Sequence, residues 1–104
     1  MFSFFSKKQK QKKNQILSLH GMAIKYVTER RSDNDDVVGR GGSISIRDNV
    51  LIIFASSEIV FRCAVDQVSA SQLLSGDGVV IEGPDAEHGG IFRKLIAYYV
   101  YHRK

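Results

Sequence analysis

SISIRDNVLIIFASSEIVFRCAV, residues 43–65, contains three runs of apolar side chains separated by two pairs of turn-forming residues. Ile44 and Ile46 alternate with serines and an arginine, as in a strand with one buried face. Asp48-Asn49 fits a two-residue hairpin loop, because both residue types tolerate positive φ, and Ser56-Ser57 marks a second tight turn. Residues 50–54 are apolar on both faces, which predicts a strand in the middle of a sheet. In the third run, Ile59, Phe61, Cys63 and Val65 are expected on the buried face.

The same period of two continues on both sides of this stretch. It predicts a first strand over residues 22–29, a turn over residues 32–36, and a return strand from Val37 that the glycines at 39, 41 and 42 bend or bulge. After residue 65, Ser69-Ala70-Ser71-Gln72 fits a capping box and predicts one short helix, with Gly76 as its stop. Further strands are expected over residues 79–81 and, after a loop at 85–90, over residues 91–102.

These elements predict an all-β, mainly antiparallel domain. Six to seven strands and one short helix, joined by short connections, favour a small barrel or a two-sheet sandwich, closed if the first and last strands pair. The chain of 104 residues is expected to hold a cationic tail over residues 1–14 and one β-domain over residues 15–104.

Bulk composition is that of an ordinary globular protein. A single cysteine, Cys63, excludes an intramolecular disulfide. The longest apolar run, residues 50–55, is too short to span a bilayer, and the phenylalanines precede the lysines, which is the reverse of the order in a secretory signal. We therefore expect a cytoplasmic protein.

Net charge separates the tail from the body. Five of the fifteen lysines and arginines lie in the first thirteen residues without an acid, which leaves ten against eleven acids in the rest of the chain. Three interpretations stay open for this tail: a solvated leader, a contact to an anionic membrane, or a contact to nucleic acid. For the membrane interpretation the candidate residues are Phe2, Phe4, Phe5, Lys7, Lys8, Lys10, Lys12 and Lys13.

Candidate sites in the body are few. Asp85, Glu87 and His88 could bind a metal weakly, but no second ligand group has a recognised spacing, so a solvated loop is the preferred interpretation. Cys63, in the middle of an apolar strand, is expected to be inert packing. A tyrosine-rich last strand suggests an interaction surface, or cross-strand pairing that stabilises the sheet. The candidate residues for that surface are Tyr98, Tyr99, Tyr101 and Arg93.

Catalytic motifs such as a phosphate-binding loop, a nucleophile elbow or a zinc-binding helix do not occur, so an enzyme is not expected, nor a cofactor or a small-molecule substrate. The leading hypothesis is a non-enzymatic interaction or adaptor module that binds a protein partner or a second copy and associates loosely with membranes through its tail. One alternative is a domain that binds single-stranded nucleic acid, against which the near-neutral body argues. The other is a small enzyme or metal protein centred on residues 85–88 or on Cys63.

Overall fold

The computed structural model describes residues 15–31 and 34–100. One helical turn at residues 15–17 precedes the first strand. The strands are β1 (Ala23–Arg31), β2 (Asn34–Arg47), β3 (Val50–Ala55), β4 (Glu58–Ala64), β5 (Ser69–Gln72), β6 (Gly78–Asp85) and β7 (Ile91–Tyr99), with a 3-10 helix, η1 (Ala86–His88), before the last strand. The predicted all-β, antiparallel class is confirmed.

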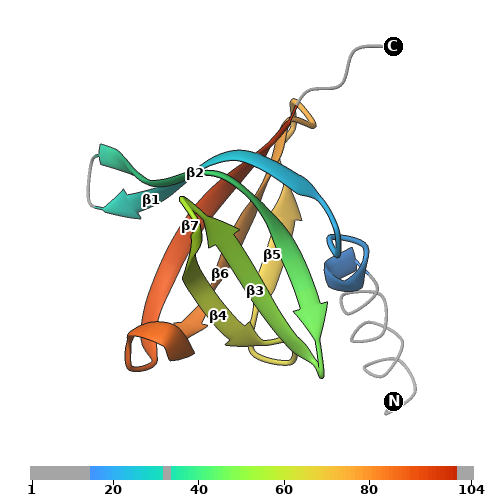
Figure 1. The fold of residues 1–104 in the computed structure, drawn as a ribbon, viewed down its shortest axis with the longest axis vertical. Helices are drawn as coiled ribbons and strands as arrows, with labels where there is room; N and C mark the ends of the chain where they lie inside the picture. Colours follow the sequence, from blue (N-terminus) through green and yellow to red (C-terminus); the bar gives the residue numbers. More distant parts are fainter. Residues whose placement is uncertain (1–14, 32–33, 101–104) are drawn as a thin grey trace.

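All seven strands form a single sheet in the order β4-β3-β2-β1-β7-β6-β5. The sheet curls round on itself, so that β4 and β6 approach each other although no ladder joins them (Figure 1). The first and last strands pair antiparallel, from Ile24 opposite Tyr99 to Glu29 opposite Leu95, but this pairing does not close the sheet, as the sequence had suggested it could. The result is an open, curved sheet whose two edge strands are β4 and β5.

Both predicted hairpin turns are confirmed by their backbone. Asp48 and Asn49 have φ of 53° and 63°, and Ser56 and Ser57 have φ of 54° and 65°. Two consecutive residues with positive φ give a turn whose twist matches that of the flanking strands. The first turn sets Arg47 opposite Val50, and the second sets Ala55 opposite Glu58.

A bulge in β4 changes which of its side chains are buried. The register between β3 and β4 shifts after the Ile53–Phe61 pair, so that Phe54 lies opposite Ile59. Val60 is therefore buried, and Ile59 is only half-buried. The expectation that Ile59 belongs to the buried face was wrong, because the bulge adds one residue to an alternation of two.

The short helix predicted from Ser69-Ala70-Ser71-Gln72 was wrong. These residues form β5, which pairs with β6 from Ser69 opposite Glu82 to Gln72 opposite Val79. A helix of four or five residues does not recover the cost of nucleating its first turn. Strand pairing instead satisfies backbone groups along β6, which would otherwise be an edge.

Other element boundaries differ from those predicted. β2 already begins at Asn34, which lies opposite Arg31, so the turn is shorter than residues 32–36. The same strand runs through Gly41, whose φ is +63°, without ending there. β6 continues past Pro84 to Asp85, and β7 ends at Tyr99.

Apolar side chains fill the inside of the curved sheet. Leu51, Ile53 and Phe61 have no exposed surface, and Ile16 and Leu19 of the N-terminal helical turn are 2% exposed within the same cluster. β2 closes tightly on β3 at Gly42, where an added Cβ would lie 1.8 Å from the backbone oxygen of Phe54. Within the described ranges, no helix is long and apolar enough to cross a membrane.

Candidate functional site

A network of charged side chains joins three strands and η1. Asp85 is the last residue of β6, Arg93 is near the start of β7, and Glu29 is near the end of β1. Antiparallel pairing of these strands brings the three residues to the same end of the sheet, opposite the end at which the helical turn packs. The network thus results from topology, because 64 residues separate Glu29 from Arg93 along the chain.

Arg93 is at the centre of this network. Its Nε and Nη2 donate to the two carboxylate oxygens of Glu29, at 3.0 and 2.8 Å. Its Nη1 donates to Oδ2 of Asp85 at 2.5 Å and to the backbone oxygen of Val60 at 2.8 Å. The side chains of Arg93 and Glu29 are each 11% exposed. The hydrogen bonds that Arg93 donates to Glu29, and then the one it donates to Asp85, outweigh burial and raise the pKa of Arg93, so the guanidinium stays charged.

Asp85 is fully buried and has four partners. Oδ1 accepts from the backbone N–H groups of Arg62 at 3.1 Å and of Glu87 at 2.9 Å. Oδ2 lies 2.5 Å from Nδ1 of His88, in addition to Arg93. Burial alone would raise the pKa of Asp85, but the hydrogen bonds from Arg93, His88 and the two backbone amides hold it below its usual range. The carboxylate is therefore ionised at neutral pH.

The metal candidates Asp85, Glu87 and His88 do lie together, but as parts of this network. Both oxygens of Asp85 are engaged by donors, and Glu87 lies 3.5 Å from the guanidinium of Arg62. Within the described residues, no three His, Cys, Asp or Glu side chains are placed to hold a metal ion. Sequence reasoning identified the cluster at residues 85–88, but Glu29 carried no signal, since its partner is distant in the chain.

Cys63 is buried on the inner face of β4, as expected. Burial, and then the negative charges of Asp85 and Asp66, raise the pKa of its thiol to about 11. A thiol with that pKa is almost entirely protonated at neutral pH, and the thiolate is the nucleophilic form. Its surroundings are those of a packing residue.

The four candidates for a tyrosine surface lie in different places. Tyr98 stacks on Tyr26, with ring centroids 4.6 Å apart, on the outer face of β7 and β1. Tyr99 packs against the core, and its hydroxyl donates to the side-chain oxygen of Gln72 at 3.0 Å. Arg93 belongs to the buried network, and Tyr101 lies outside the described residues. The structure therefore does not bring Tyr98, Tyr99 and Arg93 together on one face.

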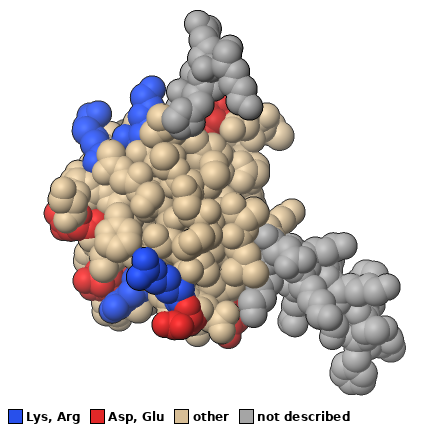
Figure 2. Space-filling view, turned by 45° about the vertical axis from the view of Figure 1, so that its right-hand side comes forward, with Lys and Arg blue, Asp and Glu red and all other residues tan. Residues whose placement is uncertain are grey.

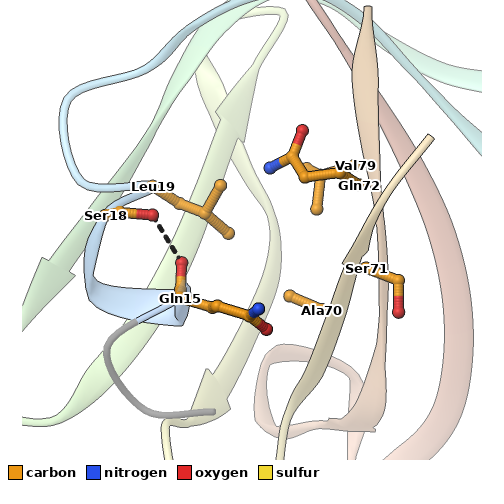
Figure 3. Close-up of a pocket in the computed structure, with 7 residues that line it drawn as sticks. All are labelled: Gln15, Ser18, Leu19, Ala70, Ser71, Gln72 and Val79. Carbon is orange, nitrogen blue, oxygen red and sulfur yellow. Dashed lines mark hydrogen bonds between the residues drawn. The ribbon is translucent and has the colours of Figure 1, made fainter. Parts of the chain in front are cut away.

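The candidate membrane residues of the tail, from Phe2 to Lys13, also lie outside the described part of the chain. The first described residue, Gln15, is beside a groove between the helical turn and the edge strand β5 (Figure 3). This groove has a volume of about 340 Å³ and is lined by Gln15, Ser18, Leu19, Ala70, Ser71, Gln72 and Val79. None of these side chains titrates near neutral pH, so the groove offers hydrogen bonds and apolar contacts but no acid or base.

β3 carries apolar side chains on its outer face as well as on its inner face. Leu51, Ile53 and Ala55 are buried inside, whereas Val50 and Ile52 are half-buried and Phe54 is 37% exposed. Ile59 of β4 lies opposite Phe54 and extends this set. Val50, Ile52, Phe54 and Ile59 are called the outer patch below. As predicted, β3 is an inner strand of the sheet, between β4 and β2. The sequence did not show that the second apolar face of this strand would meet solvent.

Figure 2 shows an area without charged side chains that has lysine, arginine and acidic side chains along its left and lower margins. Ser43 and Ser45 of β2 lie opposite Phe54 and Ile52, whereas the exposed Arg47 lies opposite Val50, so two of the patch's neighbours on that strand are small and neutral and one is charged. Arg62 of β4 lies opposite Ile52 and is exposed. An apolar centre with a polar margin is the arrangement of protein-binding surfaces.

Comparison with models of known protein families, with curated proteins and with solved structures finds no match to this chain.

Proposed function

We propose that this chain is a non-enzymatic, cytoplasmic interaction domain that binds another polypeptide, either a different protein or a second copy, through the outer patch on β3. The observation that carries the proposal is the outer face of β3. Three consecutive outward positions of one strand, Val50, Ile52 and Phe54, are apolar, and each keeps part of its surface in solvent. A strand with one face in water ordinarily alternates apolar with polar residues.

The physical reason is the cost of leaving apolar surface in contact with water. Each square ångström of apolar surface that a partner covers contributes about 25 cal/mol before the costs of association. Strand side chains on a rigid sheet lose little further conformational freedom when a partner covers them. Phe54 is of a residue type that is enriched at protein interfaces. A polypeptide partner fits this surface better than a small molecule does, because the patch is a sheet face and not a cavity.

The tail supplies a second, weaker contact in this proposal. Its five lysines contribute at most about 5 kcal/mol against an anionic membrane, at about 1 kcal/mol each, before the cost of ordering the tail. Attachment through the tail alone is therefore expected to be weak and sensitive to salt. A partner bound at the outer patch, or a second copy of the chain, would strengthen it through avidity.

Site-specific photo-cross-linking tests the patch. The full chain would carry a photoreactive phenylalanine at position 54 or, as the matched control, at position 98, where Tyr98 lies on the outer face of β7. Cross-links to another polypeptide at position 54 and not at position 98 support the proposal. Equal cross-linking at both positions, or cross-linking at position 98 alone, contradicts it. Sedimentation velocity of the purified chain and of Phe54→Ser then separates a second copy from a different protein.

Liposome co-sedimentation tests the tail independently. The full chain should sediment with anionic vesicles, and this binding should be lost as the salt concentration is raised. It should not sediment with neutral vesicles. A variant with glutamine at the five lysine positions should lose this binding and keep the cross-link at position 54. Binding that is unchanged in the glutamine variant contradicts a role for the lysines.

A further inference from the structure

The gap between the edge strand β4 and the strands β6 and β7 is bridged by side chains in place of a backbone ladder. Arg62 donates its backbone N–H to Oδ1 of Asp85, and Val60 offers its backbone oxygen to Nη1 of Arg93. Both backbone groups belong to the outer edge of β4, where a neighbouring strand would otherwise bond. One carboxylate accepts and one guanidinium donates, which is what the C=O and N–H groups of an added strand would do.

Unpaired edges of this kind attract other strands. An edge with open N–H and C=O groups and a β-prone sequence is a template for strand addition. β4 reads EIVFRCA, with five apolar residues of seven and no proline or glycine. Natural sheets protect such edges with charges, bulges or covering segments. β4 has a bulge beside Val60, and Asp85 and Arg93 occupy the groups next to it.

We propose that Asp85 and Arg93 guard the edge of β4, and that this edge is a docking site for β4 of a second copy of the chain when the guard is removed. Two β4 edges in antiparallel pairing are self-complementary, as an isologous interface requires. Glu58 near the start of the strand and Arg62 near its end are both exposed. Antiparallel pairing places the acidic end of each strand toward the basic end of the other, which favours this partner.

Asp85 and Arg93 are themselves held in place by contacts to other elements. Asp85 is also tied to η1 through the backbone N–H of Glu87 and the ring of His88, and Arg93 is tied to β1 through Glu29. The titratable groups that face the two guard residues are therefore Glu29 on β1, Arg62 on β4, and Glu87 and His88 on η1. Removal of the Asp85 carboxylate frees the amide of Arg62 directly, whereas the inner ladder between β3 and β4 is not touched.

Amide hydrogen exchange and sedimentation velocity on the full chain test this proposal together. In Asp85→Ala the amide of Arg62 should exchange more than about tenfold faster relative to core amides, and the protein should dimerise as its concentration rises. Asp35→Ala is the control, since it removes the exposed partner of Arg30. It should keep the oligomeric state of the unmodified chain, with the Arg62 amide as slow as in that chain.

Each other result overturns the proposal. Unchanged exchange at Arg62 in Asp85→Ala shows that the carboxylate does not guard the edge, and fast exchange in a strictly monomeric protein shows that the edge does not dock. A dimer that persists after Arg62→Pro is added, which removes the ladder N–H, does not form through β4. If Asp85→Ala does not fold, Asp85→Ser is measured in the same way, because the shorter side chain removes the carboxylate that accepts from the amide of Arg62. Unchanged exchange and a monomer in that variant are contrary to the proposal.

Discussion

Replacement of Arg93 by methionine should cost far more stability than replacement of any exposed arginine. Methionine keeps much of the volume but removes four hydrogen bonds to Glu29, Asp85 and Val60, at distances between 2.5 and 3.0 Å. The Asp85 side chain that loses its counter-charge has no exposed surface. Removal of one partner from a buried ion pair costs about 3–5 kcal/mol. That is a large fraction of the roughly 5–15 kcal/mol by which a small domain is stable.

Urea unfolding, followed by far-ultraviolet circular dichroism at neutral pH, measures this loss. With a slope of about 1–2 kcal/mol per molar urea for a domain of this size, the midpoint should fall by about 1.5–5 M. Arg30→Met is the control, because Arg30 pairs with Asp35 at the surface, with side chains 54% and 35% exposed. Its midpoint should stay near that of the unmodified chain. A loss below about 1 kcal/mol in Arg93→Met would refute the reasoning, since that is the range of exposed pairs.

A second variant tests whether Arg93 and Glu29 stabilise the fold as a unit. Glu29→Met combined with Arg93→Met removes the bidentate pair as a whole. Because apolar replacements of similar volume can match or exceed a buried ion pair, the double variant should be more stable than the sum of the single losses. Additive losses would show that the two side chains do not act as a unit.

Three further predictions follow from particular residues. Because the pKa of Asp85 is lower in the folded chain than in the unfolded chain, where it is about 3.9, the ionised carboxylate stabilises the fold above that pH. This stability is lost as the pH falls through the folded pKa, so the urea midpoint should drop in acid. Asp85→Asn should lack that part of the drop. Gly42→Ala should destabilise the hairpin of β2 and β3 by about 1–3 kcal/mol, because its Cβ would meet the backbone oxygen of Phe54. Ser43→Ala serves as its control in the same urea titration, and an equal effect of both changes would contradict the steric argument. Cys63, with a pKa of about 11, should react with a disulfide reagent at pH 8 only after urea unfolds the chain; fast labelling of the native protein would show that the thiol is not sealed.

Local pattern was sufficient for the elements that sequence reasoning placed correctly. The turns at residues 48–49 and 56–57 depend only on residue types that tolerate positive φ. It failed where pairing decides, as at Ser69–Gln72, because the capping signal is weaker than the hydrogen bonds that β6 offers to an added strand. It also failed at Ile59, because a bulge inverts the alternation and leaves no mark in the composition.

Candidate sites followed the same division. The sequence placed Asp85, Glu87 and His88 together because they are neighbours in the chain. Arg93 was predicted to belong to a tyrosine surface, because nothing in the neighbouring sequence indicates that its side chain pairs with Glu29 inside the fold. Likewise, residues 50–54 read as apolar on both faces, and only the fold shows that nothing in the described chain fully covers the outer one.

The sequence by itself determined an antiparallel β-domain, its two tight turns, a single cysteine in an apolar strand, and a cationic tail attached to a near-neutral body. These properties depend on side-chain periodicity, local backbone preference and charge counting, which need no knowledge of distant contacts. Tertiary structure alone decided the order of the strands, the exposure of the outer patch, and the buried network of Glu29, Asp85 and Arg93. The physical reason is that burial and charge pairing depend on which strands become neighbours, and that choice is made by the packing of the whole chain.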